Sequence, residues 1–180
     1  MQRSASEDLE HRLKALVRDV PDFPKPGVMF KDITPLLANG PAWHAAIVGL
    51  AQSIATLRPD KVVGIEARGF VVGAPIAHRL GIGFVPVRKP GKLPHAVTSV
   101  TYDLEYGSDT LEVHSDAVGS GERVVIIDDV LATGGTAAAT VDLLRRSGAE
   151  VLGLGVLIEL GFLAGRAKLG GLQVDALLSY

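Results

Sequence analysis

Residues Arg123 to Thr136 read RVVIIDDVLATGGT, and this stretch constrains the fold more than any other part of the chain. Val124 to Ile127 are four β-branched residues without polar alternation, a pattern typical of a strand buried on both faces of a parallel sheet. Asp128 and Asp129 follow, where we expect the strand to leave the sheet. Because ligands of open α/β folds bind at the carboxyl ends of strands, the acidic pair predicts a binding site there.

The loop after the acidic pair, Leu131 to Thr136, combines two glycines, which let backbone approach a ligand closely, with two threonine hydroxyls. Helix formers over Thr136 to Arg146, followed by Ser147-Gly148, predict a helix that begins at this loop. Such a loop presents N–H groups at the positive end of a helix dipole, where phosphate binds. The two carboxylates would repel a phosphate but would accept hydrogen bonds from ribose hydroxyls. The stretch therefore predicts a site for a ribose 5-phosphate unit held at both ends.

A plainer interpretation makes the aspartates solvated turn residues and the glycines mere shapers of a βα loop, since short glycine patterns often match by chance. The acidic pair and the hydroxyl-glycine loop in tandem favour the ligand site. The loop contains neither G-x-x-x-x-G-K-[ST] nor G-x-G-x-x-G, which argues against a P-loop NTPase and a dinucleotide dehydrogenase.

The string VVIIDDVLATGGT closely resembles the 5-phosphoribosyl 1-pyrophosphate (PRPP) signature of type I phosphoribosyltransferases. The resemblance implies the α/β fold of that family, a central, mostly parallel sheet flanked by helices, with a small hood from the N- and C-terminal segments. It implies one domain over residues 1–180, with the hood at 22–37 and 159–180, a flexible catalytic loop and β-ribbon at 88–110, and the PRPP motif at 124–136. The residues of this motif that it assigns to PRPP are Asp128, Asp129, Ala132, Thr133, Gly134, Gly135 and Thr136.

Residues Asp22 to Leu37 read DFPKPGVMFKDITPLL, and their prolines and glycine predict an ordered, irregular segment rather than a helix. Such a segment either covers a sheet edge or stacks an aromatic ring on a flat ligand. It closely resembles the base-binding segment of adenine phosphoribosyltransferases. The resemblance implies that Phe30 stacks on the purine and that the main chain of Met29 and Lys31 pairs with the base edge. Lys31 stands where many members carry arginine, which matters little for a main-chain contact.

A fixed pair of backbone groups can discriminate between purines. Adenine offers a donor at its 6-amino group and an acceptor at N1, whereas a 6-oxopurine offers the reverse. Each mispaired buried group costs roughly 1–3 kcal/mol, which is enough for strong discrimination.

A second strand, charged loop and helix start lie at Lys61 to Ile65 and Glu66-Ala67-Arg68-Gly69. Arg68 is either a solvated cap or, at the carboxyl end of a strand, an anion clamp. The resemblance implies that this loop holds the pyrophosphate through Arg68 and through the backbone of Ala67.

A third strand, Ile82 to Val87, precedes three cations, Arg88, Lys89 and Lys92, in a loop with two prolines and a glycine. These cations either face water in a mobile loop or form a lid that neutralises pyrophosphate. The resemblance assigns all three to PRPP, some of them reaching into a neighbouring subunit. His95 stands where a glycine is expected and receives no role.

Val97 to Tyr102 and Thr110 to His114 alternate as the strands of a β-ribbon. Spacing alone would make Glu105, at its tip, a plain turn carboxylate. The string TYDLEYG is similar to the catalytic-loop motif of the family, which implies that Glu105 is the general acid/base at the purine imidazole nitrogens and Tyr106 its neighbour. Beyond a further apolar strand, Leu160 matches the residue that covers the other face of the base.

Composition limits the remaining possibilities. The 180 residues are 47% hydrophobic and 21% charged, as in an ordinary globular domain, and the net charge of −2 does not favour nucleic acid or membrane as a partner. The chain has no cysteine, which excludes disulfides and zinc–thiolate sites and fits a cytoplasmic protein. The N-terminus predicts an amphipathic helix from Ser6 that ends before Pro21, and neither a signal peptide nor an apolar run long enough to span a bilayer.

The resemblance implies a pentosyltransferase of purine salvage that converts adenine and PRPP to AMP and pyrophosphate. It implies Mg²⁺, held mainly through PRPP and water rather than by protein ligands, and a homodimer. One alternative is a phosphoribosyltransferase for another base. A second alternative is a PRPP-sensing regulator, which should carry a helix-turn-helix or a basic face. The short segment before the hood and the negative net charge disfavour the regulator.

Overall fold

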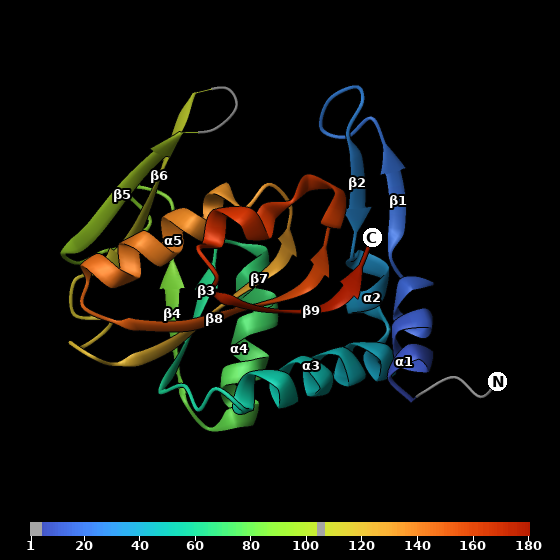
Figure 1. The fold of residues 1–180 in the computed structure, drawn as a ribbon, viewed down its shortest axis with the longest axis horizontal. Coiled ribbons are helices and arrows are strands. Elements are labelled where there is room, and N and C mark those ends of the chain that lie inside the picture. Colours follow the sequence, from blue (N-terminus) through green and yellow to red (C-terminus); the bar gives the residue numbers. More distant parts are fainter. Residues whose placement is uncertain (1–4, 104–106) are drawn as a thin grey trace. The chain divides into compact units, whose positions relative to one another are not determined.

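The computed structural model describes residues 5–103 and 107–180, and the chain divides into two compact units at residue 49. The first unit contains two strands and the helices around them (Figure 1). Its elements are α1 (Ala5–Lys14), β1 (Arg18–Pro21), β2 (Met29–Asp32), α2 (Thr34–Ala38) and the larger part of α3 (Gly40–Ala55).

Two predictions for this unit were wrong. The first helix ends at Lys14 instead of continuing to Pro21, because Arg18–Pro21 pairs as an antiparallel strand with Met29–Asp32. Val17 and Val20 fit a helical spacing, but β-branched residues also favour strands, and the pairing partner decides between the two. The segment 22–37, predicted to be irregular, contains β2 and the five-residue helix α2, which has Pro35 in its first turn.

The second unit is built on a five-stranded sheet with the strand order β4-β3-β7-β8-β9. Its strands are β3 (Lys61–Ile65), β4 (Gly83–Val87), β7 (Arg123–Leu131), β8 (Glu150–Glu159) and β9 (Gln173–Ser179). All four pairings are parallel, which confirms the predicted central sheet. The side chains of the inner strands β3, β7 and β8 are mostly buried, as expected for a sheet covered on both faces.

Helix α4 (Arg68–Leu80) follows β3, and α5 (Gly135–Arg146) follows β7. The chain steps from β3 to β4 on one side and from β7 to β8 on the other. Right-handed crossovers in opposite directions put the two helices on opposite faces of the sheet, as Figure 1 shows. The strand order therefore changes direction between β3 and β7, and the carboxyl ends of these two strands form the switch point at which α/β folds bind ligands.

Strand β7 is longer than predicted. We expected it to leave the sheet at Asp128, but its pairing with β8 continues through Leu131, opposite Glu159. On the other side, the pairing with β3 ends at Ile127, opposite Gly64. The acidic pair thus lies in a part of β7 that still pairs with β8 but no longer pairs with β3.

The remaining elements frame this sheet. Strands β5 (Val97–Asp103) and β6 (Ser108–His114) form the predicted antiparallel ribbon. After β8, the chain forms two 3₁₀ turns, η1 (Gly161–Leu163) and η2 (Gly165–Leu169), and then the edge strand β9. The last part of the segment predicted as hood, 159–180, is therefore a strand of the central sheet.

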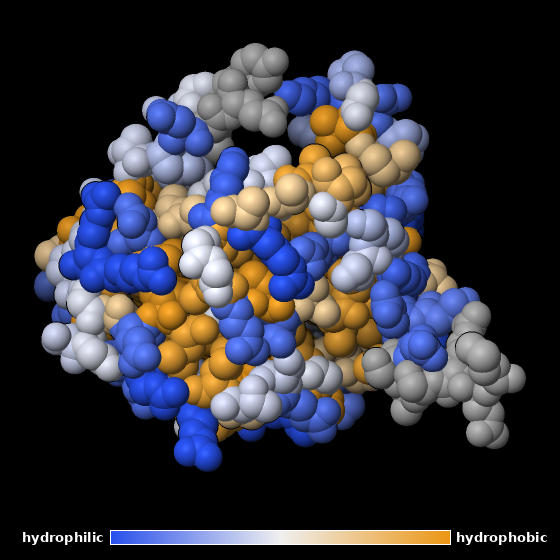
Figure 2. All heavy atoms as spheres, in the orientation of Figure 1, coloured by the Kyte–Doolittle hydropathy of each residue, from blue (hydrophilic) through white to orange (hydrophobic). Residues whose placement is uncertain are grey.

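The core of this unit lies on the sheet. Its largest fully buried side chains include Ile65, Ile126, Ile127, Leu131, Leu143 and Leu144. Figure 2 shows apolar residues between charged ones on the face that carries β8 and β9. Within residues 5–103 and 107–180, no helix combines the length and the apolar character needed to cross a bilayer.

Candidate active site

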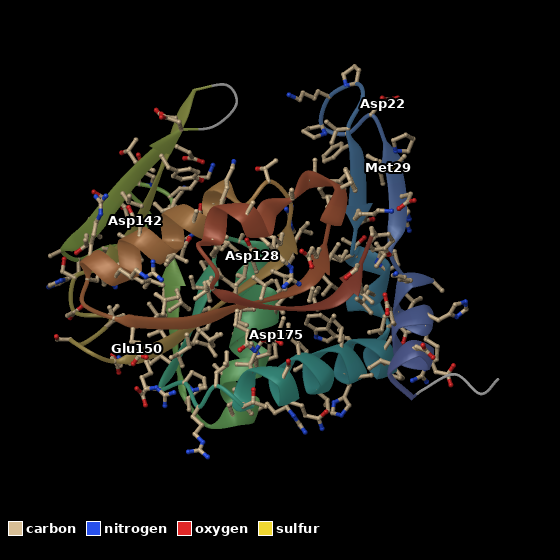
Figure 3. All side chains as sticks on the ribbon, viewed as in Figure 1. Asp22, Met29, Asp128, Asp142, Glu150 and Asp175 are labelled. Atoms are coloured by element: carbon tan, nitrogen blue, oxygen red, sulfur yellow. The ribbon has the colours of Figure 1, made fainter. Side chains whose placement is uncertain are left out.

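The acidic pair lies at the carboxyl end of β7, where β3 no longer covers it. Asp129 is only 4% exposed, whereas Asp128 is half-buried. The Asp129 backbone N–H donates to Oδ1 of Asp128 over 2.9 Å, which fixes the Asp128 carboxyl. Figure 3 shows Asp128 between α4 and α5, the two helices that start at this edge of the sheet. The two carboxylates are thus fixed at the switch point.

The environment of Asp128 disfavours a second negative charge. Burial of its carboxyl, followed by the charge of Asp129, raises the pKa of Asp128 well above its ordinary value. The nearby cation Arg68 opposes this rise without cancelling it. A perturbed carboxyl at the carboxyl ends of parallel strands is what a ligand site built on charge would show.

Arg68 and Gly69 bring the start of α4 against the end of β7. A Cβ on Gly69 would lie 2.7 Å from the Ile127 carbonyl oxygen and 3.1 Å from Oδ1 of Asp128, so only glycine permits this approach. The Arg68 Nε donates to Oδ2 of Asp129 and forms an ion pair with it. The peptide bond between Glu66 and Ala67, just before this turn, is cis. The structure therefore places the predicted clamp residue directly beside the acidic pair.

The glycine-threonine loop connects β7 to α5. Gly134 adopts a left-handed conformation with φ of 78° and forms the N-cap of α5, and Ala138 donates a backbone hydrogen bond to its carbonyl. Thr133 is exposed, and Ala132, Gly135 and Thr136 are half-buried. The free N–H groups of a helix start are thus next to accessible hydroxyls, the arrangement expected of a phosphate cradle.

Two of the three predicted lid cations are paired with carboxylates. Arg88, which follows β4, donates from Nε to Oε2 of Glu66 over 3.0 Å and lies over the Phe70 ring at 5.8 Å. Lys89 pairs with Asp109 on β6 over 2.9 Å. This pairing raises the pKa of Lys89 and lowers the pKa of Asp109. The third cation, Lys92, is exposed.

Comparison with known proteins identifies the family. The model of the phosphoribosyl transferase domain matches residues 36–169. The chain is 54% identical over 176 residues to the adenine phosphoribosyltransferase of Synechococcus sp., covering 97% of this chain and 99% of that protein. It is 58% identical over 170 residues to that of Streptomyces galbus, covering 92% and 93%. The chain belongs to the adenine phosphoribosyltransferase family.

Solved structures of adenine phosphoribosyltransferases share the fold. The enzyme of Thermoanaerobacter pseudethanolicus has a TM-score of 0.92 at 50% identity, covering 94% of this chain and 99% of that chain. The enzyme of Saccharomyces cerevisiae, complexed with an imino-altritol bisphosphate and adenine, has a TM-score of 0.89 at 39% identity, covering 96% and 99%. The type I phosphoribosyltransferase fold predicted for this chain is confirmed.

The residues predicted to bind adenine lie in the first unit. Phe30 packs its ring edge-on against Phe23 at 5.1 Å, and Met29 is 46% exposed. The Lys31 ammonium is bound to Asp19 over 2.6 Å. Figure 3 shows Met29 on β2 and Asp22 at the turn of this hairpin. Since residues two apart in a strand direct their main-chain groups to the same edge, Met29 and Lys31 present a common backbone edge.

Three predicted residues remain to be placed. Leu160 is 8% exposed, and its N–H donates to the Leu131 carbonyl over 2.9 Å. This bond ties Leu160 to the start of the glycine-threonine loop, residues 132–136, which we call the phosphate loop. Glu105 and Tyr106, predicted for catalysis, lie outside the described residues.

Tyr102 and Asp109 are two further candidate site residues, which the sequence did not single out. The Tyr102 hydroxyl lies 3.3 Å from Oγ1 of Thr136 and so links the ribbon to the phosphate loop. Asp109 neutralises Lys89 from the opposite strand of the ribbon. Tyr102 pairs with Asp109 across the ribbon. The sequence does not predict this register, because no turn motif fixes the length of the loop between the two strands. The available signal was that Tyr102 belongs to the string TYDLEYG and that Asp109 follows it by two residues.

Proposed function

We propose that the protein transfers the phosphoribosyl group of PRPP to adenine, releasing AMP and pyrophosphate, as an enzyme of purine salvage. The observation that carries this proposal is the juxtaposition of Asp128 and Asp129 with the N–H groups of the loop 132–136 at the switch point of the sheet. The 39% identical yeast relative, complexed with adenine and a sugar-like bisphosphate, supports the same substrates here.

The sugar phosphate is held at both ends. Asp128 and Asp129 accept hydrogen bonds from the ribose hydroxyls, while Ala132, Thr133, Gly134, Gly135 and Thr136 surround the 5′-phosphate with N–H and hydroxyl donors. The donors stand at the N-terminus of α5, whose dipole favours the phosphate charge. The phosphate needs hydrogen-bond donors, whereas the ribose hydroxyls need acceptors. Because the two ends of the site differ in this way, the ribose can bind in only one orientation.

The pyrophosphate is held by cations that are paired with protein carboxylates before PRPP binds and with the pyrophosphate afterwards. Arg68, Arg88 and Lys89 are each paired with a carboxylate: Asp129, Glu66 and Asp109, respectively. When PRPP binds, these guanidinium and ammonium groups turn toward its pyrophosphate, joined by Lys92 and by the backbone of Ala67. Their charge stabilises the leaving pyrophosphate as the bond to C1 breaks.

The base is held by the hood. Phe30 stacks on adenine, the main chain of Met29 and Lys31 pairs with its edge, and Leu160 covers the other face. The Lys31 side chain is occupied by Asp19, which fits recognition through the backbone. Residues 22–37 and the turn region after 159 act as hood, residues 88–110 as lid and ribbon, and residues 124–136 as PRPP motif.

The reaction exchanges one bond at C1 of the ribose for another with inversion. The C1–oxygen bond to pyrophosphate breaks as N9 of adenine forms its bond to C1, and positive charge develops on the sugar. Glu105, with Tyr106 beside it, handles the proton at the imidazole nitrogens of the base. An exchange of Glu105 for alanine should lower kcat strongly and leave adenine binding intact; an unchanged kcat would remove Glu105 from catalysis.

Mg²⁺ fits this site as a partner of PRPP rather than as a metal caged by protein. The carboxylates at hand are Asp128 and Asp129, and burial raises the pKa of Asp128, which makes it a poor direct ligand. Bound to the pyrophosphate, the ion would supply charge neutralisation of the leaving group. Asp128 and Asp129 would orient the hydroxyls and waters around it.

We further place this reaction in the cytoplasm and assign it to a homodimer, in which some of the lid cations reach the PRPP of the neighbouring subunit. Both assignments rest on the resemblance to the family. Light scattering of the purified chain tests the dimer.

The proposed activity is tested by incubating the protein with adenine, PRPP and Mg²⁺ and measuring AMP formation. AMP formation that requires all three supports it, and its absence overturns it. The same assay with guanine, hypoxanthine and uracil in competition decides whether another base is the substrate.

A further inference from the structure

The phosphate loop rests on the backbone of a second glycine, thirty-one residues further along the chain. A Cβ on Gly165 would lie 2.3 Å from the Ala132 carbonyl oxygen and 3.1 Å from the Gly134 nitrogen. In turn, a Cβ on Gly134 would lie 2.3 Å from the Gly165 carbonyl oxygen. Two backbones are thus in contact with no room for a side chain on either. The Gly165 backbone therefore packs directly against Gly134, the left-handed N-cap residue of α5, and restricts its position.

The residue after Gly165 anchors this contact. The Arg166 guanidinium donates to both carboxylate oxygens of Glu159, over 2.6 and 2.7 Å, and to the Val174 carbonyl over 3.0 Å. Bidentate pairs of this kind are strong and directional. The Glu159 side chain is 12% exposed, and the pairing lowers its pKa, so it stays ionised at neutral pH. The pair fixes η2 to the end of β8 and to β9.

The chain before Gly165 is fixed as well. The Leu160 N–H donates to Leu131, the last residue before the loop, and the Ala164 N–H donates to Gly161. Ala164 has a φ of 51°, a left-handed conformation that a non-glycine residue keeps only where its surroundings impose it. Figure 1 shows η2 beside α5. Residues 159–166 thus form a brace that begins at the end of β8 and is bonded to β7 through Leu160 and to β9 through Arg166.

We propose that Glu159, Gly165 and Arg166 are positioning residues for the 5′-phosphate: the Glu159–Arg166 pair holds the Gly165 backbone against Gly134, and this contact sets the geometry of the N–H cradle. The proposal rests on the function proposed above. None of the three residues needs to touch the substrate. The brace governs ligands that carry the phosphate, such as PRPP, AMP and ribose 5-phosphate, and leaves adenine affinity unchanged.

A purely structural role in packing the C-terminal segment predicts something different. Loss of packing would lower the melting temperature but would leave the affinity of the folded protein for ribose 5-phosphate unchanged. The comparison of Gly165→Ala with Gly119→Ala separates the two roles. Gly119 lies in the exposed turn before β7, outside the hood and the brace, and a Cβ there would come no closer than 3.8 Å to Oε2 of Glu122, an ordinary contact.

The test measures ribose 5-phosphate affinity by calorimetry and the KM values for PRPP and adenine. We expect Gly165→Ala to weaken ribose 5-phosphate binding and raise the KM for PRPP at least tenfold, with the KM for adenine within twofold of wild type. Gly119→Ala should match wild type in all three. Equal ribose 5-phosphate affinities for the two variants would overturn the proposal.

The Arg166 variants decide the matter if Gly165→Ala does not fold. Arg166→Lys keeps the charge but loses the two-pronged geometry and should weaken ribose 5-phosphate binding by an intermediate factor. Glu159→Gln, Arg166→Met and the double variant should show the same loss, because the pair acts as a unit. Wild-type affinity in folded Arg166→Met would contradict the proposal.

Ribose 5-phosphate binding needs no transfer reaction, so the two proposals fail separately. If the wild type binds this ligand more tightly than the brace variants but forms no AMP, the proposed activity is wrong and the brace is supported. If the wild type forms AMP and the brace variants bind ribose 5-phosphate normally, only the brace is wrong.

Discussion

Arg68 and Asp129 form an ion pair that joins the first turn of α4 to the carboxyl end of β7. The two partners differ in burial, since the Arg68 side chain is 57% exposed and the Asp129 side chain 5%. We therefore expect Arg68 to turn toward an incoming anion while Asp129 stays fixed in the sheet. The pair holds the proposed pyrophosphate clamp beside the proposed ribose site.

Removal of Arg68 should affect both stability and PRPP binding. In Arg68→Ala the nearly buried Asp129 carboxylate loses its cation, and we expect the free energy of unfolding to fall by about 1–3 kcal/mol. The KM for PRPP should rise at least tenfold, because a clamp of the leaving group is gone. Urea denaturation and steady-state kinetics measure the two effects.

Arg146→Ala is the matched control for this change. Arg146 pairs with Asp142 four residues earlier, with both side chains more than half exposed, so its removal should cost less than about 0.5 kcal/mol. Similar losses of stability in the two variants would show that burial of Asp129 does not matter.

The raised pKa of Asp128 predicts how stability depends on pH. In the unfolded chain this carboxyl ionises near 3.8, and in the folded protein only at higher pH. Between these two pKa values the native state binds more protons, so the free energy of unfolding falls as pH rises. Asp128→Asn removes this penalty and should raise the melting temperature at pH 7, by about 2–4 °C for each kcal/mol of penalty removed, a gain that vanishes below pH 3.8.

The same exchange should weaken PRPP binding, because the amide replaces an acceptor of the ribose hydroxyls. Asp142→Asn, at an exposed position on α5, serves as the control and should change neither property. A lower melting temperature for Asp128→Asn at pH 7 would contradict the assigned environment.

The hydroxyl of Tyr102 should matter for turnover. Strand β5 contains Tyr102 and ends at Asp103, two residues before Glu105 in the sequence, and the Tyr102–Thr136 contact ties this strand to the loop 132–136. Tyr102→Phe removes one hydrogen bond, worth about 0.5–1.5 kcal/mol, and should lower kcat roughly three- to tenfold. Thr101→Val breaks a comparable contact, Thr101 with Thr110 at 2.9 Å, on the other face of the ribbon and should leave kcat unchanged.

Phe30 and Lys31 should respond differently to exchange. Phe30→Leu removes the aromatic stack on the base, worth about 0.5–1.5 kcal/mol beyond buried area, and should raise the KM for adenine roughly three- to tenfold. Lys31→Met leaves the backbone in place and should keep this KM within twofold, although it breaks the pair with Asp19. A large rise of the KM for adenine in Lys31→Met would mean that its side chain contacts the base.

Local sequence was sufficient where one stretch carries both the pattern and the chemistry. The run from Val124 to Ile127 predicted the central strand because parallel strands are buried on both faces, and Ser147-Gly148 marked the end of α5. Both parts of the proposed sugar-phosphate site come from one continuous stretch, so one local pattern predicts them together.

Local sequence was insufficient where a residue distant in the chain determines the secondary structure or the ion pair. Arg18–Pro21 became a strand because β2 pairs with it, and β7 continued past Asp128 because β8 does. The carboxylates that hold the lid cations, Glu66 and Asp109, come from other strands and follow no fixed spacing. The brace behind the phosphate loop was missed for the same reason.

The most direct test of the account is a crystal structure of the protein with AMP. We predict that the phosphate lies within hydrogen-bonding distance of the N–H groups of residues 132–136 and that both ribose hydroxyls donate to Asp128 and Asp129. A nucleotide bound elsewhere, with this loop and the two aspartates contacting no part of it, would contradict the assignment of the site.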